Sequence, residues 1–398
     1  MSSNNNIPQL RFLGFTGEWE ERKLVDVTTN EDSKRRPVSK TERKNGPYPY
    51  YGANGVQDYM DDYIFEGDYL LIGEDGSVLT SDHTPVVNWA SGKFWVNNHA
   101  HVLSQKGDYS LKYISYVLST IKIPGLVTGI PPKLNQDNLN SILLPFPSSE
   151  IEQEKIAGFL AEIDNLIAAQ DEKVCALKEK KKGMMQQMFP QKGETTPRLR
   201  FPGFEGEWSE TPLREVAKKV NRKNKKMEVS RVLTNSANSG VVDQSAYFDR
   251  NIVVKENTNN YSIVEYEDFV YNPRVSSAAP VGPISVNKIG TGIMSPLYTI
   301  FRFNTGLTSF YEQYFQTDIW HQYLKNIANS GARFDRMNIT SEDFFNMPLM
   351  LPSLAEQQKI AECLSAMDNM IASESVKLDA LKDHKKGLMQ QLFPQNNK

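Results

Sequence analysis

The chain repeats its own framework once, and this repeat restricts the possible architectures more than any other feature of its 398 residues. Residues 8–27 and 197–216 align without gaps, with 12 of 20 positions identical. Residues 152–191 and 356–395 align with 23 of 40 identical, and both end in KKG-x-M-Q-Q-x-F-P-Q. Two units of about 199 residues are too long and too few for a stacked solenoid. A duplication without functional meaning is one interpretation, but the similarity is confined to this frame.

The longer repeats carry apolar residues at alternating steps of four and three, a heptad pattern sustained over more than four heptads. A polar residue interrupts each stripe at the same two places. Each stripe could belong to a surface helix packed on its own domain, but two matched stripes favour a shared two-helix coiled coil. Thirty-eight residues at 1.5 Å each predict rods of roughly 57 Å. The predicted seam consists of Ile156, Leu160, Ile163, Ile167, Val174 and Leu177 in one helix and Ile360, Leu364, Met367, Ile371, Leu378 and Leu381 in the other.

Antiparallel pairing of these helices would give the linear chain a circular organisation. The short motif of each unit would then follow the end of the other unit's helix, in sequence or in space, and a pseudo-two-fold axis would relate the units. The predicted class is α+β, with two mixed, β-rich domains separated by two long helices that pair as an antiparallel coiled coil. The predicted segments are residues 1–150, a first domain; 151–192, a first helical region; 193–352, a second domain; and 353–398, a second helical region.

The two variable segments, about 28–150 and 217–352, share little sequence. Both contain strand-like runs, at 63–73, 262–273 and 292–303, and Gly-containing turns. Aromatic stretches at 109–117 and 309–327 suggest helices.

Each variable segment opens with a basic cluster, at 34–44 and at 218–231, and Asn, Gln, Tyr and His follow at high density. Basic groups bind phosphate, and Asn, Gln, Arg and Lys on loops can read base edges. A single charge run is usually a solvated face, but two at matched places favour DNA. The candidate DNA-binding residues are Lys34, Arg35, Arg36, Lys44, Tyr50, Asn54, Asn98, His99, Lys133, Lys223, Lys225, Arg231, Asn235, Asn238, Arg274, Arg333 and Arg336.

A further matched feature lies near the end of each variable segment. Thr128-Gly129 precedes Lys133-Leu134-Asn135, and Ser330-Gly331 precedes Arg336-Met337-Asn338. A hydroxyl, a Gly and a cation in one turn suit a loop that grips a DNA backbone, and they suit a plain turn equally well.

Composition narrows the class of protein. The formal net charge of −3 excludes a polybasic, histone-like binder, although the placement of charge matters more than its sum. The sequence has no run of 18 apolar residues, so no transmembrane helix is predicted, and the first residues do not resemble a secretory signal. Two cysteines, Cys175 and Cys363, cannot build a disulfide framework, so a reducing, cytoplasmic location is expected.

Motifs of catalysis are missing from the sequence. Walker A, G-x-G-x-x-G and nucleophile-elbow patterns are absent, and Tyr271-Asn-Pro-Arg lacks the second Pro of an amino-methyltransferase motif. His99-x-His101 has no Cys or carboxylate partner in a metal-binding motif. We therefore expect no enzyme activity, no metal site and no cofactor in this chain.

The framework resembles the specificity subunit of type I restriction-modification systems over nearly the whole length. The resemblance rests on the LRF-x-GF-x-GEW starts at 10–19 and 199–208, PYYGANG-V with Ile-Gly-Glu-Asp-Gly within 49–76, Val-Asn-Asn-His-Ala-His-Val at 96–102, and the helix starts and ends. It implies two target-recognition domains, each reading one half of a bipartite double-stranded DNA target with an unspecified spacer. It also implies that methyltransferase subunits, two of them, dock on the helices.

Two ATP-dependent restriction subunits are expected to join them, and the resemblance implies that S-adenosylmethionine, ATP and Mg serve only those partners. No membrane partner is expected. An adaptor with two β-rich protein- or glycan-binding domains would explain the helices but not the paired basic clusters. A fused nuclease or methylase is disfavoured by the missing motifs. Because the net charge is near zero, we expect the isolated chain to bind DNA poorly and the assembled complex to bind it well.

Overall fold

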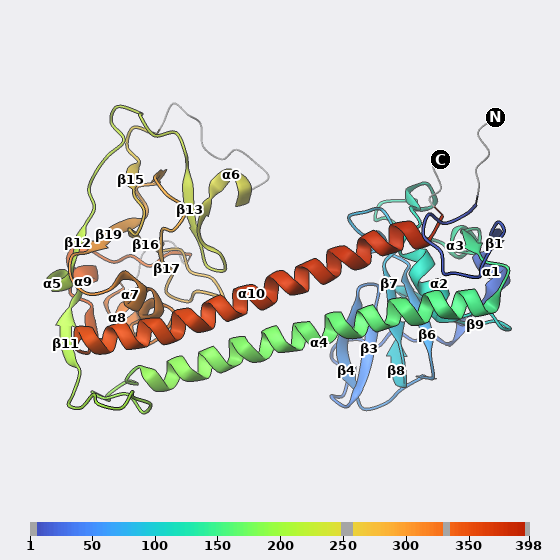
Figure 1. Ribbon diagram of the computed structural model, residues 1–398, viewed down its shortest axis with the longest axis horizontal. Coiled ribbons are helices and arrows are strands. Elements are labelled where there is room, and N and C mark those ends of the chain that lie inside the picture. The colour runs from blue at the N-terminus through green and yellow to red at the C-terminus, as the bar shows by residue number, and fades with distance from the viewer. Residues whose placement is uncertain (1–5, 248–257, 329–334, 395–398) are drawn as a thin grey trace. The chain divides into compact units, whose positions relative to one another are not determined.

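The computed structural model describes residues 6–247, 258–328 and 335–394, and the chain divides into two compact units. The first comprises residues 1–172 and 375–398, and the second comprises 173–374. Both boundaries fall inside a long helix. Each unit therefore combines one β-rich domain with part of α4 (Glu150–Met188) and part of α10 (Leu354–Leu392) (Figure 1). The predicted α+β class is confirmed, while the four predicted segment boundaries stay a prediction.

The core of the first unit is a four-stranded sheet with the order β2 (Thr28–Asn30), β9 (Ala100–Gln105), β6 (Tyr69–Gly73) and β7 (Val87–Ala90). Side chains alternate between its faces. Leu70 and Ile72 pack with α2 (Leu111–Leu118) and the long helices, whereas Leu71 packs with the second sheet. That second sheet has the order β4 (Gly55–Met60), β3 (Tyr48–Gly52), β8 (Lys93–Val96) and β5 (Phe65–Glu66).

Short elements complete the first unit. β1 (Glu20–Lys23) pairs antiparallel with β10 (Leu143–Phe146), just before α4 begins. The remaining ones are α1 (Leu24–Val27), η1 (Asp32–Lys34), η2 (Pro124–Leu126) and α3 (Gln136–Asn140). The side chain of Asn135 caps α3 by accepting a hydrogen bond from Asn138 N.

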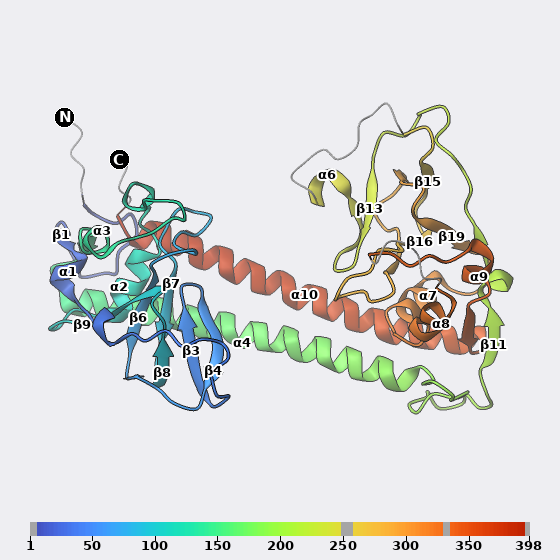
Figure 2. The same ribbon diagram turned by 180° about the vertical axis from the view of Figure 1, so that it is seen from behind.

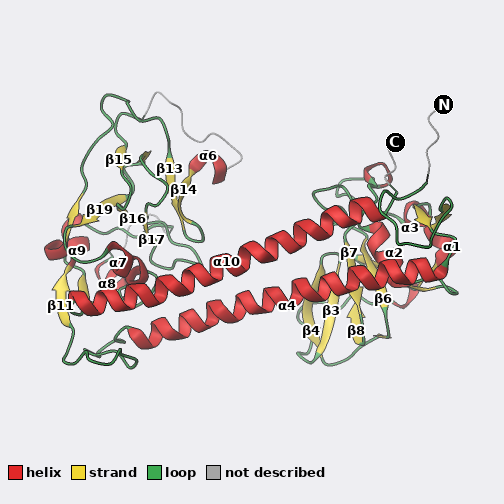
Figure 3. Cartoon of the chain, in the orientation of Figure 1, coloured by secondary structure: helices red, strands yellow, loops and turns green. Residues whose placement is uncertain are grey.

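The second unit contains a sheet of the same order, β12 (Ala217–Lys219), β19 (Thr299–Phe303), β16 (Phe269–Tyr271) and β17 (Ile284–Val286). Figure 3 labels β19, β16 and β17 among its yellow strands. Its registers match as well, because Phe269↔Phe301 corresponds to Leu70↔Leu103. Alternation repeats too: Phe269 packs toward the helices, and Val270 packs on the opposite face. The two variable segments thus share a framework that their sequences do not reveal.

Other elements of the second unit differ more from the first. In place of the second four-stranded sheet stand two pairs, β13 (Leu233–Ser236) with β14 (Gly240–Asp243), and β15 (Ser262–Val264) with β18 (Gly292–Met294). β11 (Ser209–Pro212) pairs with β20 (Pro348–Leu351) as β1 does with β10. Its helices besides α4 and α10 are α5 (Leu213–Val216), α6 (Gln244–Tyr247), α7 (Thr308–Phe315), α8 (His321–Ile327) and α9 (Ser341–Phe345) (Figure 2).

The helices α4 and α10 pair antiparallel, as predicted. In the first unit, Ile156 and Leu160 near the start of α4 share a core with Leu392 near the end of α10. In the second unit, Met188 shares a core with Ile360 and Leu364. Among the predicted seam residues, Ile156, Leu160, Ile163, Val174, Ile360, Leu364, Met367 and Leu378 are buried, and Ile167, Leu177, Ile371 and Leu381 are half-buried. Seam residues near the ends of the helices also pack in the hydrophobic cores of the domains. The two long helices therefore contact both each other and the β-rich domains.

Two polar positions of the seam form matched ion pairs. Lys385 Nζ lies 2.5 Å from Asp164 Oδ1 in the first unit, and Lys181 Nζ lies 2.6 Å from Asp368 Oδ1 in the second. A domain helix joins each pair, because Tyr116 of α2 donates to Asp164 and Gln313 of α7 donates to Asp368. These contacts tie both long helices to the domain of each unit.

The repeated short motif closes each unit around a helix end. Arg11 forms a bidentate ion pair with Glu152 at 2.7 and 2.8 Å, and Arg200 forms the same pair with Glu356 at 2.8 Å for both bonds. Each guanidinium also donates to a Gly carbonyl of its own motif. Leu10 N donates to Gln391 O near the end of α10, and Leu199 N donates to Gln187 O near the end of α4.

Within the described residues, no helix is both long and apolar enough to span a bilayer.

Candidate nucleic-acid interface

One end of the first sheet gathers four polar loop segments, which we call the first loop edge: residues 32–36, 74–76, 97–99 and 133–135. β2 and β6 end here and β9 begins here, because Asn30 pairs with Leu103 and Gly73 pairs with Ala100. The fourth segment joins through an antiparallel bridge between Asp75 and Lys133. The strand order therefore collects residues that are up to about a hundred positions apart in the chain.

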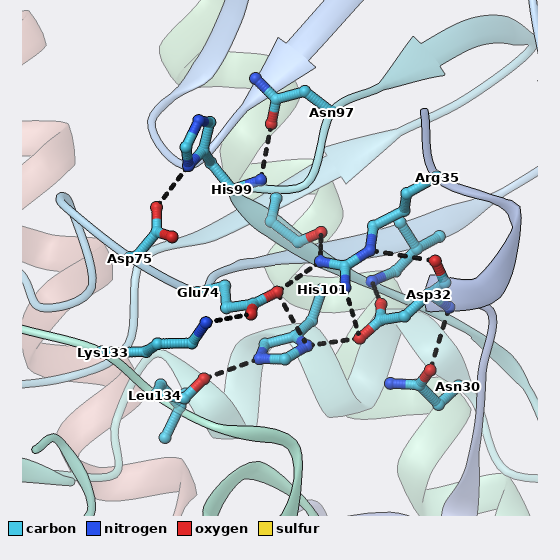
Figure 4. Close-up of polar contacts among 12 residues, drawn as sticks. Asn30, Asp32, Arg35, Glu74, Asp75, Asn97, His99, His101, Lys133 and Leu134 are labelled. Atoms are coloured by element: carbon cyan, nitrogen blue, oxygen red, sulfur yellow. Dashed lines mark hydrogen bonds and ion pairs between the residues drawn. The ribbon is translucent and has the colours of Figure 1, made fainter. Parts of the chain in front are cut away.

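A charged network holds the first loop edge together from inside (Figure 4). Arg35 Nη1 lies 2.5 Å from Glu74 Oε2, its Nη2 lies 3.3 Å from Asp32 Oδ2, and it donates to the carbonyl of Ala100. Lys133 Nζ lies 3.0 Å from the other oxygen of Glu74. Glu74 thus bridges two cations that come from different loops.

His101 connects this network to the fourth loop segment. Its Nδ1 lies 2.6 Å from Asp32 Oδ2 and its Nε2 lies 2.8 Å from the carbonyl oxygen of Leu134, while the residue is 1% exposed. Both partners are hydrogen-bond acceptors. The ring therefore links the Asp32 carboxylate in one loop segment to the backbone of Leu134 in another.

The network also keeps its acids ionised. Burial by itself would raise the pKa of Asp32, but hydrogen bonds from His101 and Val102 and the charge of Arg35 hold that pKa below its ordinary value. For Glu74, burial is again outweighed, by Arg35 and Lys133, and its pKa is lowered. The same contact with Glu74 raises the pKa of Lys133.

Asp32, Glu74 and His101 could in principle hold a metal ion, since their ligand atoms lie within 4.8 Å of one another. The protein's own cations already engage these carboxylates, however, because Arg35 contacts both and Lys133 contacts Glu74. A metal ion would have to displace both side chains. The arrangement is therefore that of a structural ion-pair network.

The solvent side of the first loop edge offers separate polar groups. His99 Nδ1 lies 2.5 Å from Asp75 Oδ1, and the side chain of His99 is half exposed. Asn98 is exposed beside it, and Asn54 is exposed in the turn between β3 and β4. Lys34 pairs with Glu31 at 2.8 Å, and Arg36 is exposed. Donors and acceptors thus lie side by side on accessible loops, as direct reading of bases requires.

The second unit has an equivalent edge, the second loop edge, formed by residues 236–240, 272–274 and 335–338. Here Arg274 and Arg336 form the antiparallel bridge that Asp75 and Lys133 form in the first unit. Amide side chains replace the charged network. Asn272 Nδ2 donates to Asn235 O, and Asn235 Nδ2 donates to Val270 O and Pro283 O. Asn238 is exposed in the adjoining turn.

The structure separates the remaining sequence candidates. Tyr50 and Asn235 are 1% exposed, and Arg35 is bound within the network. These three residues are therefore not part of the proposed interface. Lys44 is exposed, and its carbonyl accepts a hydrogen bond from the N–H of Asp61, the residue that follows β4. Three further candidates are exposed and lie outside the segments of the second loop edge: Lys223, which donates to Ser262; Arg231, which donates to Asp243 and Ile289 O; and Lys225. Arg333, like Ser330-Gly331, lies outside the described residues.

Asp32, Glu74 and Asp75 were missed by sequence reasoning because the search for DNA contacts favoured cations. Glu74 and Asp75 directly follow a predicted strand run, so a search for polar residues at strand ends would have found them. Asp32 has no comparable signal, because its role depends on His101, 69 positions away.

Comparisons with known proteins agree with this architecture. The family described as "Type I restriction modification DNA specificity domain" matches residues 16–178 and 205–383. A type I restriction enzyme specificity subunit, MjaVIII of Methanocaldococcus jannaschii, is 23% identical over 414 residues, which covers 98% of this chain and 95% of the relative.

Two solved structures share the fold. The type I restriction-modification S subunit from M. genitalium superposes with a TM-score of 0.59 at 15% identity, covering 98% of this chain and 99% of that one. A chain from a study of complex assembly and conformational transition of the type I R-M system has a TM-score of 0.52 at 14% identity, covering 96% and 99%. Because the two family matches together span most of the sequence, the chain belongs to the type I restriction-modification specificity subunits.

Proposed function

We propose that this chain is the DNA-reading subunit of a type I restriction-modification complex, in which each β-rich domain reads one half of a bipartite target. The observation that carries the proposal is the pair of loop edges. They occupy equivalent ends of equivalent sheets, yet one presents Asp75, His99 and Lys133 while the other presents Arg274 and Arg336. A shared backbone with unlike side chains suits two readers of different base sequences.

The framework is proposed to dock the partners. Arg11–Glu152 with Lys385–Asp164 in one unit repeat as Arg200–Glu356 with Lys181–Asp368 in the other. Two equal surfaces suit two copies of one methyltransferase subunit, and two restriction subunits would join them. In this proposal the chain is not catalytic and works in the cytoplasm. S-adenosylmethionine, ATP and Mg would be bound by those partners.

The two long helices are further proposed to set the length of the unread spacer. A heptad is about 10.5 Å of helix, which matches roughly three base pairs of DNA. Removing one heptad from both α4 and α10 keeps the seam in phase and should shorten the spacer of methylated sites. An unchanged spacer in a folded variant would contradict the proposed role of the helices.

An exchange of domains tests the reading of half-targets. Residues 28–150 are replaced by the corresponding segment of another specificity subunit, and the methylated sites of cells that also hold the partner subunits are sequenced. One half of the target should change while the other half and the spacer are retained. Changes in both halves would refute modular reading, and a complex without sequence-specific DNA binding would favour the adaptor.

A further inference from the structure

The two loop edges can be aligned residue by residue through their backbone hydrogen bonds. Leu134 N donates to Glu74 O at 2.8 Å, and Met337 N donates to Pro273 O at 2.8 Å. In the first unit Asp75, the residue after Glu74, forms an antiparallel backbone bridge with Lys133. In the second unit Arg274, the residue after Pro273, forms the same bridge with Arg336. Position 274 in the second unit therefore corresponds to position 75 in the first, and 336 corresponds to 133.

The backbone that carries Arg274 is tightly constrained. Its N–H donates to Asn272 Oδ1 at 3.1 Å, and Val275 N donates to Asp335 O at 3.1 Å. Gly282 packs so closely on this turn that a Cβ atom there would overlap the carbonyl of Asn272. The backbone of Arg274 is thus held at a defined place, from which its side chain extends, as direct reading of a base requires.

The charges at this bridge do not compensate one another. Like charges directly opposite each other in a sheet are destabilising. Arg274 is exposed, and within the described residues its guanidinium has no ion pair or hydrogen bond. Arg336 forms a long ion pair with the exposed Asp335, at 3.6 Å between Nε and Oδ2, without a hydrogen bond. By contrast, the equivalent Lys133 is paired with Glu74. Two arginines at directly paired backbone positions suit a ligand that is rich in acceptors.

We propose that Arg274 and Arg336 determine the base specificity of the second domain by reading guanine in its half of the target. The inference rests on the proposed function and deepens it. Guanine offers two acceptors, O6 and N7, on its major-groove edge, and the guanidinium fork donates to both. The first domain has Asp75 and Lys133 at these positions, and Asp75 is paired with His99, so its half-target is read by different contacts.

The test uses the assembled complex with its partner subunits and duplexes that carry the methylated target. Each base pair of the second half is replaced in turn, and affinities are compared for the parent chain, Arg274→Gln, Arg274→Lys and Arg336→Gln. For the parent, replacing the contacted G·C pair should weaken binding at least about tenfold. In Arg274→Gln that discrimination should fall to near onefold at one position, with the first half unaffected. Arg336→Gln should do the same at another position.

Lysine separates base reading from phosphate binding. Arg274→Lys keeps the charge but loses the planar fork, so discrimination should fall below that of the parent although overall affinity is largely retained. Arg231→Gln is the matched control, because Arg231 belongs to the same domain but is bound by Asp243 and Ile289 O. Uniformly weaker binding without altered base preference in Arg274→Gln would overturn the inference and assign a phosphate contact. Failure of the parent complex to prefer any bipartite sequence would instead refute the proposed function.

Discussion

The loops of the two loop edges are held in place by different kinds of side chains. In the first unit a network of ion pairs among Asp32, Arg35 and Glu74, with the buried ring of His101 bonded to Asp32, fixes the loops. In the second, neutral amides do so, with Asn272 bonded to the backbone of Asn235 and Arg274. The sheet order and the bridge are retained in both. The backbone of an edge can thus be kept while its support and its surface are exchanged.

The framework shows the opposite behaviour, because its contacts are nearly identical in the two units. Bidentate Arg–Glu bonds differ by no more than 0.1 Å, and the Lys–Asp seam pairs differ by the same amount. The supporting side chains of the two loop edges thus differ, whereas the contacts of the framework are repeated. The following variants test this contrast.

The largest effect is expected from the framework arginines. Arg11→Ala and Arg200→Ala each leave a carboxylate that is 1% exposed, Glu152 or Glu356, without its partner. Breaking a buried pair by removing one member costs about 3–5 kcal/mol. We expect a similar loss of unfolding free energy from both, measured by denaturant unfolding, with hydrogen exchange placing each loss in its own unit.

Arg198→Ala is the control for these variants. Arg198 pairs with Glu194 on the surface and its side chain is 66% exposed, so its removal should change stability by less than about 1 kcal/mol. A large difference between Arg11→Ala and Arg200→Ala would show that the frame is not energetically repeated.

A smaller effect is expected from the seam. Asp368→Lys sets a second cation against Lys181, whose side chain is 8% exposed, and should cost about 2–3 kcal/mol. Asp164→Lys acts on Lys385, which is 21% exposed, and should cost less, about 1–2 kcal/mol. Thermal unfolding measures both.

The reversed pairs provide the control for the seam. Asp368→Lys with Lys181→Asp, and Asp164→Lys with Lys385→Asp, should each recover most of the loss. If neither double variant recovers stability, the pairs are not the source of the effect.

Sequence was sufficient for the parts of the molecule that repeat. The heptad steps predicted the seam from Ile156 to Leu381, and the matched turns pointed to Lys133 and Arg336 at equivalent places. The strand-like runs at 63–73, 262–273 and 292–303 located β6, β16 and β19 of the main sheets, but each run divides into two strands, the first at Gly67, whose φ is +121°. The strands β2, β7, β12 and β17 of these sheets were not predicted. Each of these features is encoded in local spacing.

Features that depend on distant pairing could not be predicted. The common sheet order of the two domains rests on registers such as Leu70↔Leu103 and Phe269↔Phe301, and no residue identity marks the correspondence. Asn235 looks like a base reader in sequence, but pairing buries its amide against Val270 and Pro283. Burial of a polar residue follows from tertiary contacts rather than from its neighbours in the chain.

The smallest effect on stability is expected from the loop edges, and its dependence on pH should distinguish the charged first loop edge from the second, which is held by amides. Glu74→Gln removes the negative charge and one of the two oxygens that bond Arg35 and Lys133, and should cost about 1–2 kcal/mol at pH 7. The pKa of Glu74 is lowered in the folded chain, so its contribution is complete above the ordinary value of 4.5 and is lost as pH falls through the folded value. The difference between parent and variant should therefore vanish in acid. Asn272→Ala, the matched change in the second unit, removes no titrating group, so its cost should stay constant over the same range. Denaturant unfolding between pH 7 and about 3 measures both, and a pH-independent cost for Glu74→Gln would show that the first edge does not depend on its charges.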